Sequence, residues 1–163
     1  MRIRPATPAD VRRIAELHVA SWRSGYRGLV DDDVLDRLSV DERERQWREH
    51  VERITVLVAE EGDRLAGFVA FTPATGEIGA LYVAPERFRQ GTGSALIEAA
   101  HEVIAAAGRH EAVLWVFAGN ADGRAFYAAH GYEPDGASAT ESRSGLEEIR
   151  MWRNLPRNTR GRP

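Results

Sequence analysis

Two glycines near the middle of the chain are spaced to bind an anion. Gly91 and Gly93 follow a short apolar run at 78–83 and lead into an amphipathic stretch from 94 to 107. Apolar residues recur in that stretch at helical spacing, which predicts a strand, a glycine loop and a helix. The first N–H groups of a helix lack intrahelical partners, and the helix dipole adds partial positive charge there. Because glycine has no Cβ, a large anion could approach these N–H groups closely.

The loop fits neither of the common nucleotide-binding patterns. A dinucleotide loop would have a third glycine where Leu96 stands, and a Walker loop requires a lysine, which this sequence lacks. A pair of glycines also occurs at ordinary corners between a strand and a helix. The spacing alone therefore leaves the identity of the anion open.

The stretch from Glu77 to Leu96 resembles the acetyl-CoA loop of the GNAT superfamily of N-acetyltransferases. The residues that match the family pattern are Val83, Pro85, Gly91, Gly93 and Leu96. Two positions depart from the pattern: Phe88 stands where Arg or Gln is usual, and Arg89 where the first glycine is common. In the family these positions bind pyrophosphate mainly through backbone N–H groups, so the resemblance still implies an anion site.

A second stretch resembles the family motif that follows the next strand. Its matching residues are Asn120, Phe126, Tyr127, Gly131 and Tyr132, while Gly123 replaces the usual alanine. The two motifs stand in the family order, separated by one predicted helix and one predicted strand. Together they indicate the family much more strongly than either does alone.

The resemblance implies acetyl-CoA as co-substrate and assigns residues to it. The implied cofactor-binding residues are Leu81, Tyr82, Val83, Arg89, Gln90, Gly91, Thr92, Gly93, Ser94 and Asn120. Tyr127 matches the general acid that protonates the departing thiolate. Glu77 falls where many members hold the carboxylate that accepts the proton of the amine, although many others lack it. Trp22 and Tyr26 are either walls of the acceptor pocket or ordinary core packing.

The expected function is transfer of acetyl from acetyl-CoA to a primary amine of a small molecule by direct attack. One alternative is a protein N-terminal or peptide acetyltransferase, and another is a non-catalytic acyl-CoA-binding module. The bulk of Trp22 and Tyr26 favours an enclosed pocket, and retention of Tyr127 favours catalysis. The acidic run at 31–33 would favour a cationic acceptor if it faced the site.

Composition narrows the class of protein further. The chain has 163 residues, a formal net charge of −3 and no cysteine. The charge does not indicate a nucleic-acid-binding protein, and without cysteine there is no thiolate metal site. No apolar segment is long enough for a membrane span or typical of an export signal, so we expect a cytoplasmic location. We expect no metal, because the histidines have no ligand spacing. Dimers are common in the family, so a homodimer is a further expectation without a located interface.

The predicted elements form one domain over residues 1–155, followed by a flexible Arg/Pro tail at 156–163. A strand at 2–4 precedes a helix that begins near Thr7 and that is ended by the glycines of the stretch 22–28, and two shorter helices follow. The remaining order is three strands, the central helix, a strand, a helix and two strands. The implied fold is α/β (α+β), with a mixed, mostly antiparallel sheet splayed at its fourth strand and helices on both faces.

Overall fold

The computed structural model describes residues 1–156, and the predicted tail lies outside them except for Pro156. Its strands are β1 (Arg2–Pro5), β2 (Thr55–Glu61), β3 (Arg64–Thr72), β4 (Glu77–Val83), β5 (Glu111–Phe117), β6 (Glu133–Thr140) and β7 (Glu147–Asn154). Its helices are α1 (Val11–Gly25), α2 (Asp32–Asp36), α3 (Val40–His50), α4 (Thr92–Ala106) and α5 (Ala121–Ala129). Short 3-10 turns occupy Pro8–Asp10 and Pro85–Arg87. The predicted mixed fold is confirmed.

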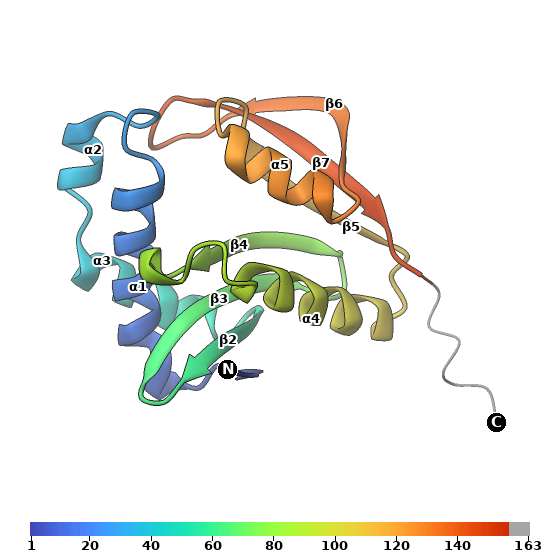
Figure 1. Cartoon of the computed structure of the whole chain (residues 1–163), viewed down its shortest axis with the longest axis horizontal. Helices are drawn as coiled ribbons and strands as arrows, with labels where there is room; N and C mark the ends of the chain where they lie inside the picture. The colour runs from blue at the N-terminus through green and yellow to red at the C-terminus, as the bar shows by residue number, and fades with distance from the viewer. Residues whose placement is uncertain (157–163) are drawn as a thin grey trace.

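All seven strands belong to one sheet, in the order β1-β2-β3-β4-β5-β7-β6. Neighbouring strands are antiparallel except β4 and β5, which pair in parallel at only two positions, Glu77 with Val113 and Ile78 with Leu114. Beyond Ile78 the two strands separate, and the sheet opens between them (Figure 1). The predicted splay at the fourth strand is therefore present.

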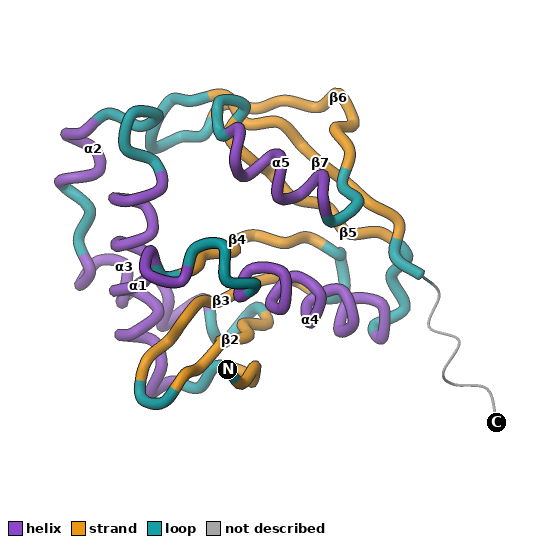
Figure 2. The backbone as a smooth tube through the Cα atoms, in the orientation of Figure 1, coloured by secondary structure: helices purple, strands orange, loops and turns teal. Residues whose placement is uncertain are grey.

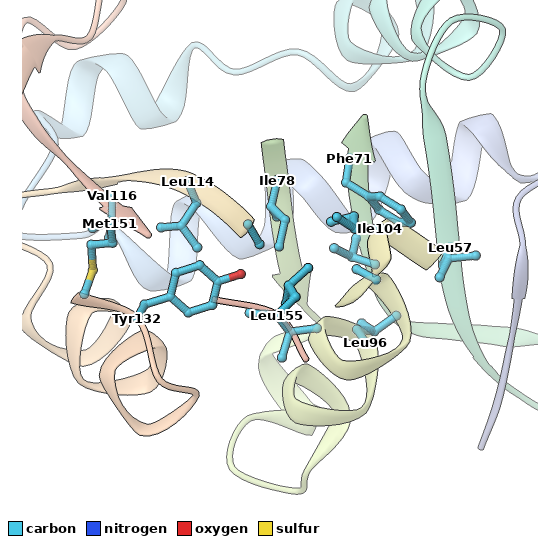
Figure 3. Close-up of a cluster of buried hydrophobic side chains, with 14 of the residues drawn as sticks. Leu57, Phe71, Ile78, Leu96, Ile104, Leu114, Val116, Tyr132, Met151 and Leu155 are labelled. Atoms are coloured by element: carbon cyan, nitrogen blue, oxygen red, sulfur yellow. The ribbon is translucent and has the colours of Figure 1, made fainter. Parts of the chain in front are cut away.

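Helices cover both faces of the sheet because its strands alternate their side chains between two cores (Figure 2). On β2, Leu57 and Ala59 pack in the cluster that includes α4, whereas Val56 and Val58 pack in the cluster that includes α1. Figure 3 shows the α4 side, where side chains from β2, β3, β4, β5 and β7 meet the helix. These two cores fix α1 and α4 on opposite sides of β4.

Side-chain caps explain where two of the helices begin. The hydroxyl of Ser39 accepts a hydrogen bond from the Glu42 N–H at 3.3 Å, and Asn120 Oδ1 accepts one from the Gly123 N–H at 2.9 Å. α1 continues past Trp22 to Gly25, because the Tyr26 N–H donates a hydrogen bond to the Trp22 carbonyl and closes the last turn. The prediction that the glycines of the stretch 22–28 end this helix is confirmed, since α1 ends at Gly25. Within residues 1–156 no helix is both long and apolar enough to cross a membrane.

Candidate active site

One large cavity occupies the opening between β4 and β5. Its volume is about 1190 Å³, and residues of α1, α3, β4, β5, α5, β7 and the loop before α4 line it. The cavity runs from the start of α4 at one end to α3 and the β6–β7 loop at the other. The splay of the sheet thus produces a continuous site rather than a simple gap between strands.

The first end of the cavity is the glycine loop and the start of α4. Gly91 has a φ of 84°, a left-handed conformation that glycine adopts without strain. The Ala95 N–H bonds to the Gly91 carbonyl at 3.0 Å, which leaves the earlier N–H groups of the helix without intrahelical acceptors. Arg87, Phe88 and Arg89 also line this end. The arrangement can bind a large anion such as a pyrophosphate.

The middle of the cavity is lined by the free edge of β4. Leu81, Tyr82 and Val83 pair with β3 on one side, but on the other side they face the opening and not β5. A strand edge of this kind offers backbone N–H and C=O groups to an extended ligand. The Val83 carbonyl already accepts a hydrogen bond from the Ser21 hydroxyl at 2.9 Å.

Aromatic side chains line the end of the cavity beside α1. Trp22 Nε1–H donates to the Tyr82 hydroxyl at 2.9 Å, and the Tyr26 ring lies 4.9 Å from that of Trp22, edge to face. Phe117 lies 5.2 Å from the Tyr26 ring. Burial raises the pKa of Tyr26 above its ordinary value, so this phenol stays protonated. This part of the cavity is therefore lined by packed aromatic rings and carries neutral hydroxyl groups.

Tyr127 on α5 and Asn120, the residue just before this helix, both line the cavity. Burial, and secondarily the neighbouring Tyr82, raises the pKa of Tyr127 above its ordinary value. Asn120 caps α5, and a Cβ at position 123 would lie 2.5 Å from its amide nitrogen. Gly123 thus leaves room for this conformation of Asn120.

Most of the predicted site residues meet in this one cavity. Those that line it are Trp22, Tyr26, Leu81, Tyr82, Val83, Arg89, Gly91, Gly93, Ser94, Asn120 and Tyr127. Gln90 and Thr92 do not line it: the Gln90 amide donates to the Glu86 carbonyl, and Thr92 is buried. Glu77 is exposed at the start of β4, where it is paired with Val113, and also lies outside the lining.

Further polar residues that the sequence did not single out for the site also line the cavity, among them His18, Arg43, Arg143 and Glu148. Trp47 Nε1–H donates to His18 Nδ1 at 3.0 Å, and burial lowers the pKa of His18 to about 3, so this imidazole is neutral. Arg43 had a detectable signal, because it stands one helical turn before the apolar anchor Trp47 on the same face of α3. For Arg143 and Glu148, only the folding of distant segments brings them to the site.

The acidic run at 31–33 does not contribute to the cavity. Asp32 pairs with Arg27 at 3.0 Å, and Asp33 pairs with Arg37 at 3.7 Å. Two of its three acids are therefore engaged by arginines outside the site. This arrangement removes the argument for a polycationic acceptor that the sequence had raised.

Comparison with known proteins identifies the family. Residues 52–134 match the family model described as an acetyltransferase (GNAT) domain. The chain is 31% identical over 125 residues to an uncharacterized N-acetyltransferase of Bacillus subtilis, covering 72% of each chain. It is 29% identical over 170 residues to a probable N-acetyltransferase of Mycobacterium tuberculosis, covering 96% of each. The chain therefore belongs to the GNAT acetyltransferase family.

Solved structures share the fold at lower sequence identity. The PaiA N-acetyltransferase of Thermoplasma acidophilum, in complex with coenzyme A, has a TM-score of 0.79 at 21% identity and covers 94% of this chain and 98% of its own. A putative acetyltransferase of Salmonella typhimurium with acetyl-CoA has a TM-score of 0.69 at 20% identity, covering 97% and 95%. Both support the assignment of the mixed, splayed sheet to this fold.

Proposed function

We propose that this protein transfers an acetyl group from acetyl-CoA to a primary amine of a small molecule. The observation that carries the proposal is the continuity of the cavity, from the anion-binding start of α4 to the aromatic pocket around Trp22. A cofactor whose pyrophosphate binds at the start of α4 would extend along the cavity. Its far end would then lie next to an acceptor held in the aromatic pocket. The proposal thus accounts for both ends of the cavity with one reaction.

The residues present fit acetyl-CoA. The N–H groups at Gly91–Ser94 can hold the pyrophosphate, and the free edge of β4 at Leu81–Val83 can hydrogen-bond an extended arm. When bound, acetyl-CoA supplies an activated acetyl thioester. The protein would position the acceptor nitrogen next to the thioester carbonyl, and a backbone N–H of β4 would polarise that carbonyl.

Tyr127 is our candidate for the acid that protonates the leaving thiolate. Its raised pKa keeps the phenol protonated at neutral pH, so the proton is available when negative charge develops on sulfur. Tyr127 lines the cavity from α5, opposite the β4 edge. Its position and its protonation state both support this role.

Glu148 is our candidate for the group that accepts the proton of the amine. It lines the acceptor side of the cavity, whereas Glu77, the sequence-based candidate, is exposed at the far end of β4. Burial, with the neighbouring charge of Glu141, raises the pKa of Glu148 above its ordinary value. A carboxylate with a raised pKa is a better base near neutral pH than an exposed one.

The role of Tyr127 is tested by release of free thiol from acetyl-CoA in the presence of amines. Replacing Tyr127 with phenylalanine should lower kcat by about 10²-fold or more, because general acid catalysis contributes that much. Tyr132→Phe is the matched control, since this buried tyrosine bonds to His101 and does not line the cavity. Equal kcat values for wild type and Tyr127→Phe would remove Tyr127 from the mechanism. If only peptides act as acceptors, the small-molecule assignment is wrong.

A further inference from the structure

Arg43 is a buried cation without a carboxylate partner. Only 6% of the residue is exposed, yet no acidic side chain of residues 1–156 lies within 4.0 Å of its guanidinium. One N–H donates to Gln46 Oε1 at 2.9 Å, and Cζ lies 5.8 Å from the centre of the Trp22 ring. Burying a charge without a counter-charge is costly, so such a group usually has a functional partner.

The nearest acids are already engaged. Glu141 accepts hydrogen bonds from the N–H and hydroxyl of Ser144, both at 2.7 Å, and from the Arg143 N–H at 3.1 Å. Although burial opposes it, these bonds lower the pKa of Glu141, which therefore stays ionised and held in its own loop. Glu42, next to Arg43 in α3, accepts only the Gln46 amide, at 3.4 Å. Neither carboxylate neutralises Arg43 directly.

Arg143 adds a second positive charge at the same place. Both Arg43 and Arg143 line the main cavity and also a smaller one, of about 270 Å³, beyond it. They therefore stand together where the acceptor end of the cavity meets α3. Neighbouring like charges repel, and a bound anion would relieve this repulsion for both arginines.

Arg43 is close to the expected reaction centre, because the Trp22 ring lies between its guanidinium and the β4 edge. The Trp22 ring lies beneath the Arg43 guanidinium, and its Nε1–H donates to Tyr82 of the β4 edge. Glu148, on the same side of the cavity, would attract the ammonium form of the acceptor. A small molecule with an amine and an anion a few bonds apart would match this separation of charges.

We propose that the acceptor is an amino acid or a close relative, whose carboxylate is bound by Arg43 with Arg143 contributing. Arg43 has unpaired N–H groups in a planar fork, which suits the two oxygens of a carboxylate. The inference rests on the proposed function, and it adds the chemical class of the substrate. It also explains why a buried arginine stands in the acceptor pocket without an internal ion pair.

The test compares matched acceptors. A panel of α-amino acids is assayed with acetyl-CoA beside the amines that result from removing each carboxyl group. For at least one pair, wild-type protein should give a kcat/KM about 10- to 100-fold higher for the amino acid, mainly through KM, as hydrogen bonds to charged groups are worth that factor. Decarboxylated amines that match or exceed their amino acids throughout the panel would overturn the proposal.

The variants assign the preference to Arg43. Arg43→Met should reduce the preference for the carboxylate to near 1, and Arg143→Gln, at an exposed position that cannot unfold the core, should reduce it by several-fold. Arg45→Met is the matched control, because Arg45 is exposed on the same helix and lines neither cavity. A preference that survives both Arg43→Met and Arg143→Gln would contradict the proposed subsite.

A binding measurement separates this inference from the proposed function. The melting temperature of the protein with saturating CoA is measured with each amino acid and each matched amine. A rise with amino acids alone that Arg43→Met abolishes supports the subsite, even if no acceptor is acetylated and the proposed function fails. If the amino acids neither raise the melting temperature nor react, while other amines are acetylated, the subsite is wrong and the proposed function stands.

Discussion

At the scale of residues, burial sets the protonation of several groups that line the cavity. Burial raises the pKa values of Tyr26 and Tyr127, so both phenols stay neutral donors. It lowers the pKa of His18 to about 3, with smaller effects from the Arg43 and Arg143 charges. Burial and the neighbouring charge of Glu141 raise the pKa of Glu148, which moves its ionisation toward neutral pH.

The pH dependence of kcat/KM should identify the proton acceptor. If Glu148 is the base, activity rises as pH increases through its raised pKa, because only the ionised carboxylate can take a proton. Glu148→Gln should remove this acidic limb of the profile and lower the plateau by about 10²-fold or more. The profile is measured by thiol release across the pH range in which the protein stays folded.

Two further variants complete that experiment. Glu77→Gln should retain the acidic limb, since Glu77 is exposed outside the cavity. Glu147→Gln, an exposed neighbour on β7, controls for a general change of surface charge. Loss of the limb in Glu77→Gln and its persistence in Glu148→Gln would restore Glu77 as the base.

The sequence predicted those cavity residues that stand together in one local motif. Tyr127 and Asn120 were found because they stand at fixed spacing in a single motif on α5, and both reach the cavity. Glu148 was not singled out because its neighbours in the cavity come from other segments, which a linear pattern cannot bring together, whereas the spacing of Arg43 to Trp47 within α3 was a detectable signal. Glu77 illustrates the same limit: its spacing to the loop fits the family, but its exposure depends on where β4 meets β5.

At the scale of elements, the contact between β3, β4 and α4 fixes the edge that faces the opening. Gly67 on β3 packs closely against both β4 and α4. A Cβ at this position would be 2.8 Å from the Tyr82 carbonyl and 2.9 Å from Leu96 Cδ1. Gly79 on β4 differs, since a Cβ there would meet only the Ala70 carbonyl, at 3.9 Å. The two glycines are therefore not equivalent, although both stand in central strands.

Alanine substitutions should separate these two positions. Gly67→Ala should lower the free energy of unfolding by about 1–3 kcal/mol, because the added methyl forces β4 or α4 to shift. Gly79→Ala should change it by less than about 1 kcal/mol, since its Cβ enters free space at the cavity. Urea unfolding of both variants provides the measurement. A Gly79→Ala variant as unstable as Gly67→Ala would show that the packing around β4 differs from this account.

Element order was predictable because each element carries its own local signals. Hydrophobic spacing and the glycine turns identified the helices and strands, with ends displaced by one to three residues. The end of α1 at Gly25 falls within the glycine-containing stretch 22–28 that was predicted to end the helix. The splay itself came from the family resemblance, since no local pattern records how far β4 and β5 remain paired.

At the scale of the whole molecule, the sheet has two parts that meet at only two residue pairs. Strands β1–β4 with α1 and α4 carry the loop and the β4 edge, while β5–β7 carry Phe117 and Glu148. The cavity lies between the two parts, and ligands that contact both should stabilise the folded chain. Acetyl-CoA, which would contact the α4 start, β4 and α5 together, is the ligand for which we expect the largest effect.

The most direct test of this account is thermal unfolding with and without acetyl-CoA, with ATP as the ligand control. At a hundredfold excess over the dissociation constant, native-state binding should add about 2.7 kcal/mol of stability, a rise of several degrees. Gly91→Glu, which places a carboxylate in the anion site, should abolish the rise. Gly108→Glu should keep it, because Gly108 has the same left-handed backbone at the opposite end of α4. A rise that persists in Gly91→Glu, or no rise in the wild type, would contradict the binding of acetyl-CoA in this cavity.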